Sequence, residues 1–492
     1  MKIFRIAYLF FGLTVLLSLQ TYSQFPEDVL RLSFPGTGVG ARALGLGMAY
    51  TGVANDFSAI YWNPAGLGQL HMNELSFGLS NLSYGNKSTF FNNSQSFTNS
   101  ATNLNDIGLV YSVPTRQGSF AIALGYGHDA DFTTGLSFSG FNPRSSIIQS
   151  WAPDGASLNG SRNGNLAYEL WLADVDSFGP KDFRWNSQIK DSLAQSGKVI
   201  EGGGLNRVSA AAAFEAAPDL FLGATVNVIT GSYTYSREYF EDDFNNLYAG
   251  RQHWEFQSLS LLESVESDLS GFDIKLGMLY KYAPNSRIGF SIKTPSWITV
   301  RETFSQSGTS EYYVADEPYH PKSSSYIAAD NEQNEYDATT PFVFSAGGSY
   351  GIQSLMVAAD IEYTDWTQME FRNANSRLLA FNTQIKEEFR PTLNLHLGAE
   401  YEVVPSILQL RGGFAYLPSP YAGDPSDFAR KYVTGGLSFV AQNAIIIELG
   451  FARGFWKNYR LNYDYSINGK QTSVTNEDVR TTSLLGTVSY RF

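Results

Sequence analysis

The sequence predicts an all-β protein, a transmembrane antiparallel β-barrel of about 14 strands with a small plug in its lumen. Three observations lead to this fold class. The composition combines 15% aromatic residues and 45 glycines with only 16% charged residues, as in membrane barrels whose strands are apolar on one face and whose aromatic residues gather at the membrane interfaces. An export leader precedes the strands, and an alternating segment ends the chain at Phe492.

The amino terminus is interpreted as a signal peptide over residues 1–23. Lys2 and Arg5 precede an apolar run over 6–19, and Ser23 supplies the small residue at the expected cleavage point. The apolar run is shorter than the roughly 20 residues of a membrane-spanning helix. No Cys follows it, so we expect no lipoprotein anchor.

Charge and residue usage exclude several function classes. The net charge of −13 disfavours nucleic acid or any other polyanion as a partner. The absence of Cys excludes disulfides, thiolate metal sites and a Cys nucleophile. The five histidines lie on separate segments without ligand spacing, and the acidic run 241–243 lacks a calcium-loop pattern. The sequence therefore predicts no metal site, no cofactor and no enzyme, and a hydrolase is the least favoured function.

The carboxyl-terminal segment indicates the membrane. Its residues alternate, with one face formed by Leu484, Gly486, Val488, Tyr490 and Phe492. A last strand that stops on Phe resembles the insertion signal of bacterial outer-membrane barrels. We therefore expect the protein in the outer membrane of a Gram-negative bacterium, in contact with outer-membrane lipid and lipopolysaccharide, as a monomer.

Fourteen segments fit strands of about ten residues. They lie at 73–84, 104–113, 118–128, 206–217, 220–234, 271–282, 287–301, 341–350, 355–366, 392–403, 407–416, 432–441, 444–456 and 481–492. Short connections between them alternate with long ones. Outer-membrane barrels keep short turns in the periplasm and long loops outside, so both termini are expected on the periplasmic side. The longest predicted extracellular loops are 129–205, 235–270 and 302–340.

The predicted barrel, residues 73–492, follows an amino-terminal hatch or plug over 24–72. Its central part, Gly40 to Gly68, is rich in Gly and Ala, and small residues allow one backbone to approach another closely. A barrel of this width has a lumen that side chains alone do not fill. This segment is the candidate that closes it.

The plug resembles the hatch of the FadL/TodX family of outer-membrane transporters for long-chain fatty acids and other hydrophobic molecules. The matching residues are the start at 40–45, the tripeptide 54–56 and Asn63-Pro64-Ala65, and the segments 360–366 and 411–416 look like later strand motifs of the family. By this resemblance the plug residues of interest are Arg42, Asp56, Asn63, Pro64 and Ala65. Pairing of Arg42 and Asp56 with wall charges, and capping by Asn63, would be structural roles.

The resemblance implies passive uptake of hydrophobic molecules, with capture at the outer loops and release through a lateral opening. It places a kink in the third strand, where Gly125 and Gly127 are the candidates; alternatively, these glycines only make room for the plug. Among inward-facing cations, Lys275, Lys293 and Arg411 are the candidates for a fatty-acid carboxylate.

Two further alternatives stay open. A FadL-like barrel can also serve as a docking or shuttle component of a protein secretion system, which is the second functional hypothesis. The apolar residues of the longest loops, such as Leu166, Leu170, Trp171 and Leu172, either form an apolar capture groove or pack together as a lid.

Overall fold

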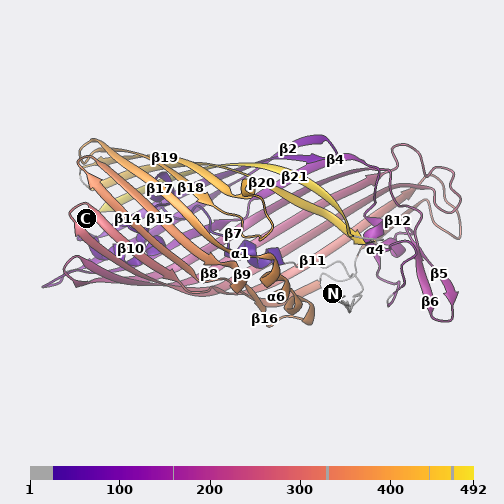
Figure 1. Cartoon of the computed structure of the whole chain (residues 1–492), viewed down its shortest axis with the longest axis horizontal. Coiled ribbons are helices and arrows are strands. Elements are labelled where there is room, and N and C mark those ends of the chain that lie inside the picture. The colour runs from indigo at the N-terminus through magenta and orange to yellow at the C-terminus, as the bar shows by residue number, and fades with distance from the viewer. Residues whose placement is uncertain (1–25, 159, 328–331, 443, 467–469) are drawn as a thin grey trace, which may run out of the picture.

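The computed structural model describes residues 26–158, 160–327, 332–442, 444–466 and 470–492 (Figure 1). The predicted signal peptide lies outside the described residues. The strands form one sheet in which neighbours pair antiparallel, and the sheet closes where β1 pairs with β21, for example Leu75 with Tyr490. Closure leaves no open edge, as the hydrocarbon of a membrane requires.

Within the described residues the barrel has 14 strands. Eleven of them are the continuous strands β1 (Glu74–Phe90), β2 (Asn93–Val113), β7 (Leu193–Ala217), β8 (Leu220–Asp242), β9 (Phe256–Ala283), β15 (Leu355–Asp365), β17 (Pro391–Val404), β18 (Leu408–Leu417), β19 (Arg430–Ala441), β20 (Ile445–Ser466) and β21 (Lys470–Arg491). The third, seventh and eighth are interrupted, and consist of β3 (Phe120–Asp131) with β4 (Thr134–Asn142), β10 (Ser286–Lys293) with β11 (Trp297–Tyr312), and β13 (Glu332–Thr339) with β14 (Val343–Ile352). The predicted strand count is confirmed.

Four short strands of the described chain lie outside the main barrel strands. β16 (Glu370–Arg372) pairs with β13 beside α6, partway along the barrel, and β12 (Ser323–Ile327) pairs with β11 nearer the end opposite the carboxyl terminus (Figure 1). The separate hairpin of β5 (Asp174–Gly179) and β6 (Asp182–Asn186) projects from that same end.

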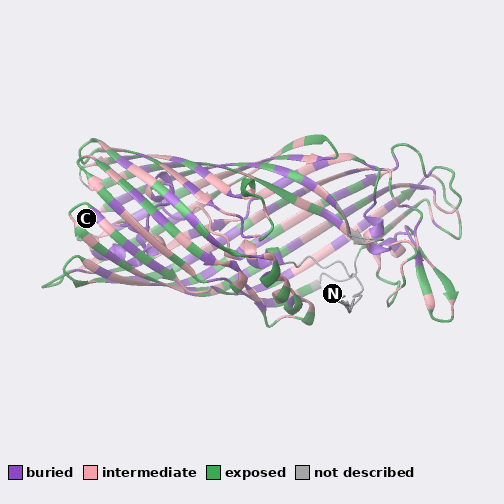
Figure 2. Cartoon of the chain, in the orientation of Figure 1, coloured by how far each residue is buried: buried purple, intermediate pink, exposed green. Residues whose placement is uncertain are grey.

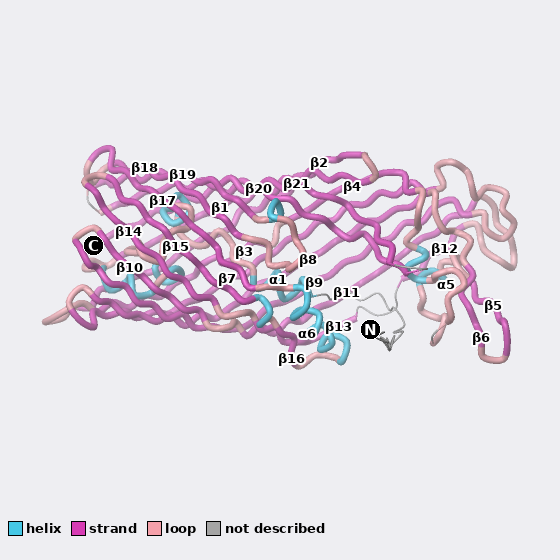
Figure 3. Tube along the Cα trace, in the orientation of Figure 1, coloured by secondary structure: helices cyan, strands magenta, loops and turns pink. Residues whose placement is uncertain are grey.

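Helices are few and short (Figure 3). The amino-terminal ones are α1 (Pro26–Ser33), α2 (Ala41–Gly45), α3 (Ala59–Trp62) and η1 (Pro64–Gln69), and the loop ones are α4 (Ile148–Trp151), α5 (Leu166–Glu169), η2 (Trp366–Gln368), α6 (Ser376–Glu388) and η3 (Ser426–Phe428). None of the helices in the described chain is long and apolar enough to cross a membrane.

Buried and exposed residues alternate along the strands (Figure 2), and the exposed set forms an outer apolar belt around a polar interior. Leu449 of β20 is 55% exposed, whereas its neighbour Glu448 is buried. The same alternation places Leu124 and Leu276 outside, and Asp273 inside. A strand with one face in lipid must carry its apolar residues on that face. The observed exposure therefore confirms the predicted lipid-facing residues.

Several strands continue where the sequence predicted loops. β1 and β2 meet in a tight turn at Phe91 and Asn92, both with positive φ, and so form a hairpin across the predicted loop 85–103. Most of 235–270 likewise belongs to β8 and β9. Beyond the apolar belt the extensions of β1 and β2 are mostly polar, whereas those of β8 and β9 turn apolar residues such as Leu259 and Leu261 inward. The outward apolar alternation of a lipid-facing strand therefore ends while the backbone ladder continues.

Leu449→Arg tests the position of the belt. We expect this change to lower the free energy of unfolding by about 2–4 kcal/mol, because a cation near the membrane midplane loses its hydration. Leu461 lies on the same face of the same strand but far beyond the belt, and Leu461→Arg should cost only about 0–1 kcal/mol. Reversible urea unfolding in lipid vesicles measures both; equal costs would contradict the assigned belt.

Candidate functional site

The amino-terminal segment fills the lumen and touches the barrel wall through glycines. Ala41, Leu44 and Leu67 of this plug are fully buried. The wall positions whose added Cβ would lie within 3.2 Å of a plug atom are Gly108, Gly125, Gly127, Gly223, Gly277, Gly289, Gly398, Gly413, Gly436 and Gly450. At Gly289, for example, a Cβ would lie 2.1 Å from the carbonyl oxygen of Thr51. At most of these positions the backbone of the plug packs directly against the backbone of the wall. The plug therefore closes the bore along its own height.

Asn63 joins the plug to the wall. Its Nδ2 donates to the carbonyl oxygens of Thr51, at 2.8 Å, and of Met278 in β9, at 3.0 Å. Its Oδ1 accepts the backbone N–H of Ala65 at 3.2 Å and caps η1, whose first residue is Pro64. Both polar atoms of the Asn63 side-chain amide are thus hydrogen-bonded, and they hold the Asn63-Pro64-Ala65 tripeptide against the wall.

Arg42 is held by a wall carboxylate. Its Nε and Nη2 each donate to an oxygen of Glu400 at 2.9 Å, a bidentate arrangement that suits a buried pair. Arg411 of β18 donates from Nε to the same Glu400 at 2.6 Å, and its Nη2 lies 3.0 Å from Glu448. Asp56 does not meet a wall charge: it accepts hydrogen bonds from Tyr50 and Ser58 within the plug.

A cavity of about 80 Å³ lies between the plug and the barrel wall. Lys275 of β9 and Lys293 of β10 line it together with apolar residues of the amino-terminal segment, such as Phe34, and with three carboxylates. The carboxylates are those of Asp129, Asp360 and Glu362. Arg411, in contrast, does not line this cavity. The structure therefore brings together two of the three cations that the sequence proposed for a carboxylate.

The two lysines lack the carboxylate partners that the neighbouring arginine has. Arg207 contacts Asp129 at 2.6 Å and also pairs with Asp273. Lys275 donates only to the carbonyl oxygen of Tyr61. Among the described residues, neither Lys275 nor Lys293 makes an ion pair. The cavity thus combines apolar residues and carboxylates with two lysines that make no direct ion pair among the described residues.

The amino-terminal helix α1 closes this cavity from above. Val29 and Leu32 are buried among residues of β9, β11 and α6. Phe34, just after the helix, stacks on Trp366 with ring centroids 5.6 Å apart, and the guanidinium of Arg430 lies 3.7 Å from the Phe34 ring centroid. The sequence analysis did not identify this helix, although the spacing of its apolar residues is helical.

The third strand leaves the barrel ladder above the plug. Backbone pairing of β2 with β3 ends at Asp106 and Gly127, and the register with β7 shifts between His128 and Ala130. The continuation, β4, pairs with β7 alone. Side chains of the β1–β2 hairpin reach its backbone instead, as where Asn86 Nδ2 donates to the carbonyl oxygen of Gly135 at 3.1 Å. β4 is therefore displaced from β2 and lies against the inner face of that hairpin.

Side-chain hydrogen bonds span the unpaired stretch, and those of Asn93 and Gln95 with Ser139 lie at its far end. Asn103 Nδ2 donates to Asp131 Oδ2 at 2.8 Å, and Asn99 Nδ2 donates to the carbonyl oxygen of Thr134 at 2.9 Å. They connect β2 to the third strand where backbone bonds are missing. The predicted kink residues lie at the last paired positions of the ladder: Gly125 faces the ring of Phe57, and Gly127 faces Val39.

An apolar hollow of about 730 Å³ lies on the outer surface just below this stretch. Gly108 and Gly125 sit opposite each other in β2 and β3 and leave the wall thin there, with Phe57 of the plug directly behind. The hollow is lined mainly by outward apolar side chains, which include Leu75, Phe77, Ile107, Leu109, Leu124, Val208 and Tyr490. It is a lipid-facing surface next to the point where the ladder ends.

The longest loop packs into the barrel mouth. Leu166, Leu170 and Leu172 are buried in one apolar cluster with residues of β8, β9 and β11, whereas Trp171 is 44% exposed. Glu241, at the end of β8, accepts hydrogen bonds from Ser146 Oγ at 2.5 Å and from the N–H of Ile147 at 2.8 Å. This packing corresponds to a lid, the second of the two arrangements considered for the loop.

The closed barrel, the lumenal plug and the apolar belt can be compared with known proteins. The family model of outer membrane protein transport proteins (OMPP1/FadL/TodX) matches residues 193–492. The chain belongs to this FadL/TodX family. Its members form outer-membrane barrels that transport hydrophobic compounds, and the predicted family and barrel class are therefore confirmed. No curated protein sequence matches the chain.

Solved structures share the fold of this FadL/TodX-family protein. A FadL homologue of Pseudomonas aeruginosa superposes with a TM-score of 0.55 at 14% identity, over 94% of this chain and 100% of the homologue. The toluene transporter TodX of P. putida gives a TM-score of 0.53 at 14% identity, over 92% of this chain and 99% of TodX. At 14% identity this structural similarity establishes a shared fold only.

Gly413→Ala tests the contact between plug and wall. The Cβ of the new alanine would lie 2.4 Å from the backbone nitrogen of Gly47, so either the plug or the wall must shift. We expect a loss of about 1–3 kcal/mol in unfolding free energy and a higher ion conductance in planar bilayers. At the adjacent outward position, Gly412, a Cβ meets nothing within 4 Å, and Gly412→Ala should change stability by less than about 0.5 kcal/mol. Identical behaviour of the two variants would refute the packing role.

Proposed function

We propose that this protein carries hydrophobic molecules with an anionic head group, such as long-chain fatty acids, passively across the outer membrane, without a catalytic step. The observation that supports this cargo is the pair Lys275 and Lys293, which lines a cavity of mixed polar and apolar character and makes no ion pair among the described residues, although Asp129, Asp360 and Glu362 line the same cavity. A carboxylate placed between two ammonium groups gains charge-assisted hydrogen bonds. The alkyl chain gains roughly 25 cal/mol for each Å² removed from water.

The proposed route begins at the long-loop end, which we place outside the cell, with the short turns and the plug toward the periplasm. The buried lid of Leu166 and Leu170 must loosen to admit cargo, because it fills the mouth. Below the cavity, the glycine-lined contact between wall and plug blocks a straight path. We therefore infer a sideways exit through the unpaired stretch between β2 and the third strand, into the apolar hollow outside.

Neutralising the two lysines tests the cargo. In the double variant Lys275→Gln/Lys293→Gln we expect the affinity for a long-chain fatty carboxylate to fall by roughly 10- to 150-fold, the equivalent of one charged hydrogen bond. Binding of the matching long-chain alcohol should not change. Competition with a fluorescent fatty acid on the purified protein measures both.

Lys281 provides the control, because it lies on the same strand and face as Lys275 but outside the cavity; Lys281→Gln should bind like the unmodified protein. If the double variant keeps its affinity for the carboxylate, the cargo is not held by its charge, and a neutral hydrocarbon becomes the better candidate. Recovery of exported proteins with the purified barrel, without fatty-acid binding, would instead support the docking hypothesis.

A disulfide across the unpaired stretch tests the exit. The chain has no cysteine of its own, so Asn103→Cys/Asp131→Cys introduces a single pair where the side chains now touch. We expect oxidation to stop most fatty-acid uptake by cells, and reduction to restore it. Ser264→Cys/Ser305→Cys places the same bond between cross-strand partners of the intact β9–β11 ladder and should leave uptake unchanged. Normal uptake through an oxidised Asn103–Asp131 pair would exclude this exit.

A further inference from the structure

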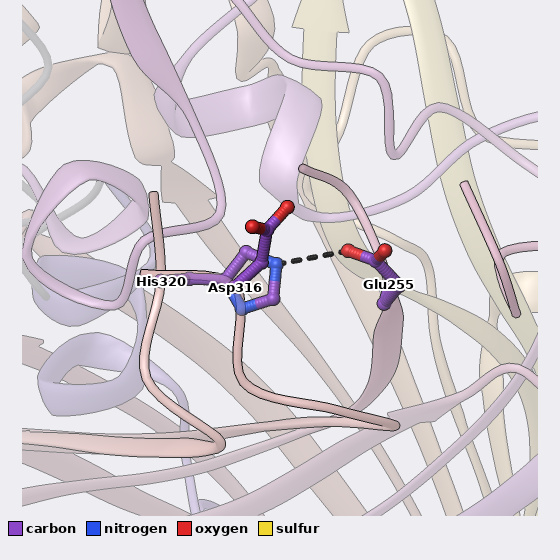
Figure 4. A group of neighbouring side chains, drawn as sticks. All are labelled: Glu255, Asp316 and His320. Carbon is purple, nitrogen blue, oxygen red and sulfur yellow. Dashed lines mark hydrogen bonds and ion pairs between the residues drawn. The ribbon is translucent and has the colours of Figure 1, made fainter. Parts of the chain in front are cut away.

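A group of metal-ligating side chains lies among the outer loops, apart from the cavity and the unpaired stretch. Glu255 immediately precedes β9, and Asp316 and His320 belong to the loop that follows β11 (Figure 4). One ligand atom of each residue lies within 4.8 Å of the others. The imidazole Nε2 of His320 is 3.1 Å from Glu255 Oε2. The fold thus unites residues that lie about 60 positions apart in sequence, which is why ligand spacing along the chain could not reveal them.

The group is held in place by its surroundings. Asp316 and His320 exchange two backbone hydrogen bonds of 3.0 Å, which close a turn between them. The His320 ring stacks on Tyr312 with centroids 4.1 Å apart and is 1% exposed, and Glu255 is also buried. His253 Nδ1 lies 2.7 Å from Asp316 Oδ2 and orients that carboxylate from behind.

The spacing and the donor set fit a metal ion. Two ligands of a tetrahedral Zn²⁺ with bonds of about 2.0–2.1 Å lie about 3.3 Å apart, close to the His320–Glu255 separation of 3.1 Å. An ion pair alone would explain that contact, but it does not explain why a second carboxylate, Asp316, approaches the same imidazole. An imidazole with two carboxylates suits Zn²⁺ and similar ions better than Ca²⁺ or Mg²⁺, which prefer oxygen ligands alone.

We propose that Glu255, Asp316 and His320 bind one Zn²⁺-like divalent transition-metal ion, with His253 as a positioning residue for Asp316. A fourth coordination position is left for water. The ion ties the start of β9 to the loop after β11. Tyr312, which stacks on His320, donates its hydroxyl to the carbonyl oxygen of Leu170 in the lid at 2.9 Å. Metal binding therefore braces the lid from outside.

Zinc titration of the chelator-stripped protein in detergent tests this site. Calorimetry should show one Zn²⁺ per chain. Glu255→Gln and His320→Asn should each lower the affinity at least about 100-fold, because a ligand is lost, whereas His253→Ala should lower it about 10- to 100-fold, as for residues that orient a ligand.

His71 provides a matched control, because it is exposed at the opposite end of the barrel; His71→Ala should bind Zn²⁺ like the unmodified protein. Heat-modifiable migration on gels checks that each variant is folded. Substitution of the unmodified protein with Co²⁺ gives a second readout, with visible absorption typical of four or five nitrogen and oxygen ligands. Absence of Zn²⁺ uptake, absence of this absorption, or unchanged binding in both Glu255→Gln and His320→Asn would overturn the proposal.

Discussion

The close contact between the plug backbone and the barrel wall is the constraint on which the rest of this molecule depends. It requires glycine at facing wall positions, because any Cβ at Gly289 or Gly413 would overlap plug atoms. The same contact removes the bore that a barrel of this width would otherwise have. The proposed route therefore bypasses the plug, and it uses the cavity and the unpaired stretch of the third strand.

Charges inside the barrel serve two different purposes. Arg42, Arg411, Glu400 and Glu448 neutralise one another across the plug–wall contact, where an unpaired charge would be costly to bury. Lys275 and Lys293 lie in the cavity without such compensation. Sequence could place all of these residues on inward faces, but only the fold shows which charges are already satisfied. Arg411, a candidate ligand from sequence, belongs to the first group.

The sequence predicted what alternation and composition encode. Outward residues such as Leu449, the number of strands and the plug with its Asn63 tripeptide all follow from local patterns. The extensions of β1, β2, β8 and β9 were not predicted, since outside the membrane their outward faces lack the continuous apolar alternation of a lipid-facing strand. The pairing of Glu255 with His320 and the shift of β4 away from β2 are long-range outcomes of the fold, and no local pattern marks them.

The side-chain bonds across the third strand have an energetic consequence. Each net hydrogen bond contributes about 0.5–1.5 kcal/mol. The side-chain bonds from β2 to the third strand, including those of Asn99 and Asn103, therefore hold this stretch less strongly than a continuous backbone ladder would. The wall is weakest here, where single side chains replace the pairing of whole strands.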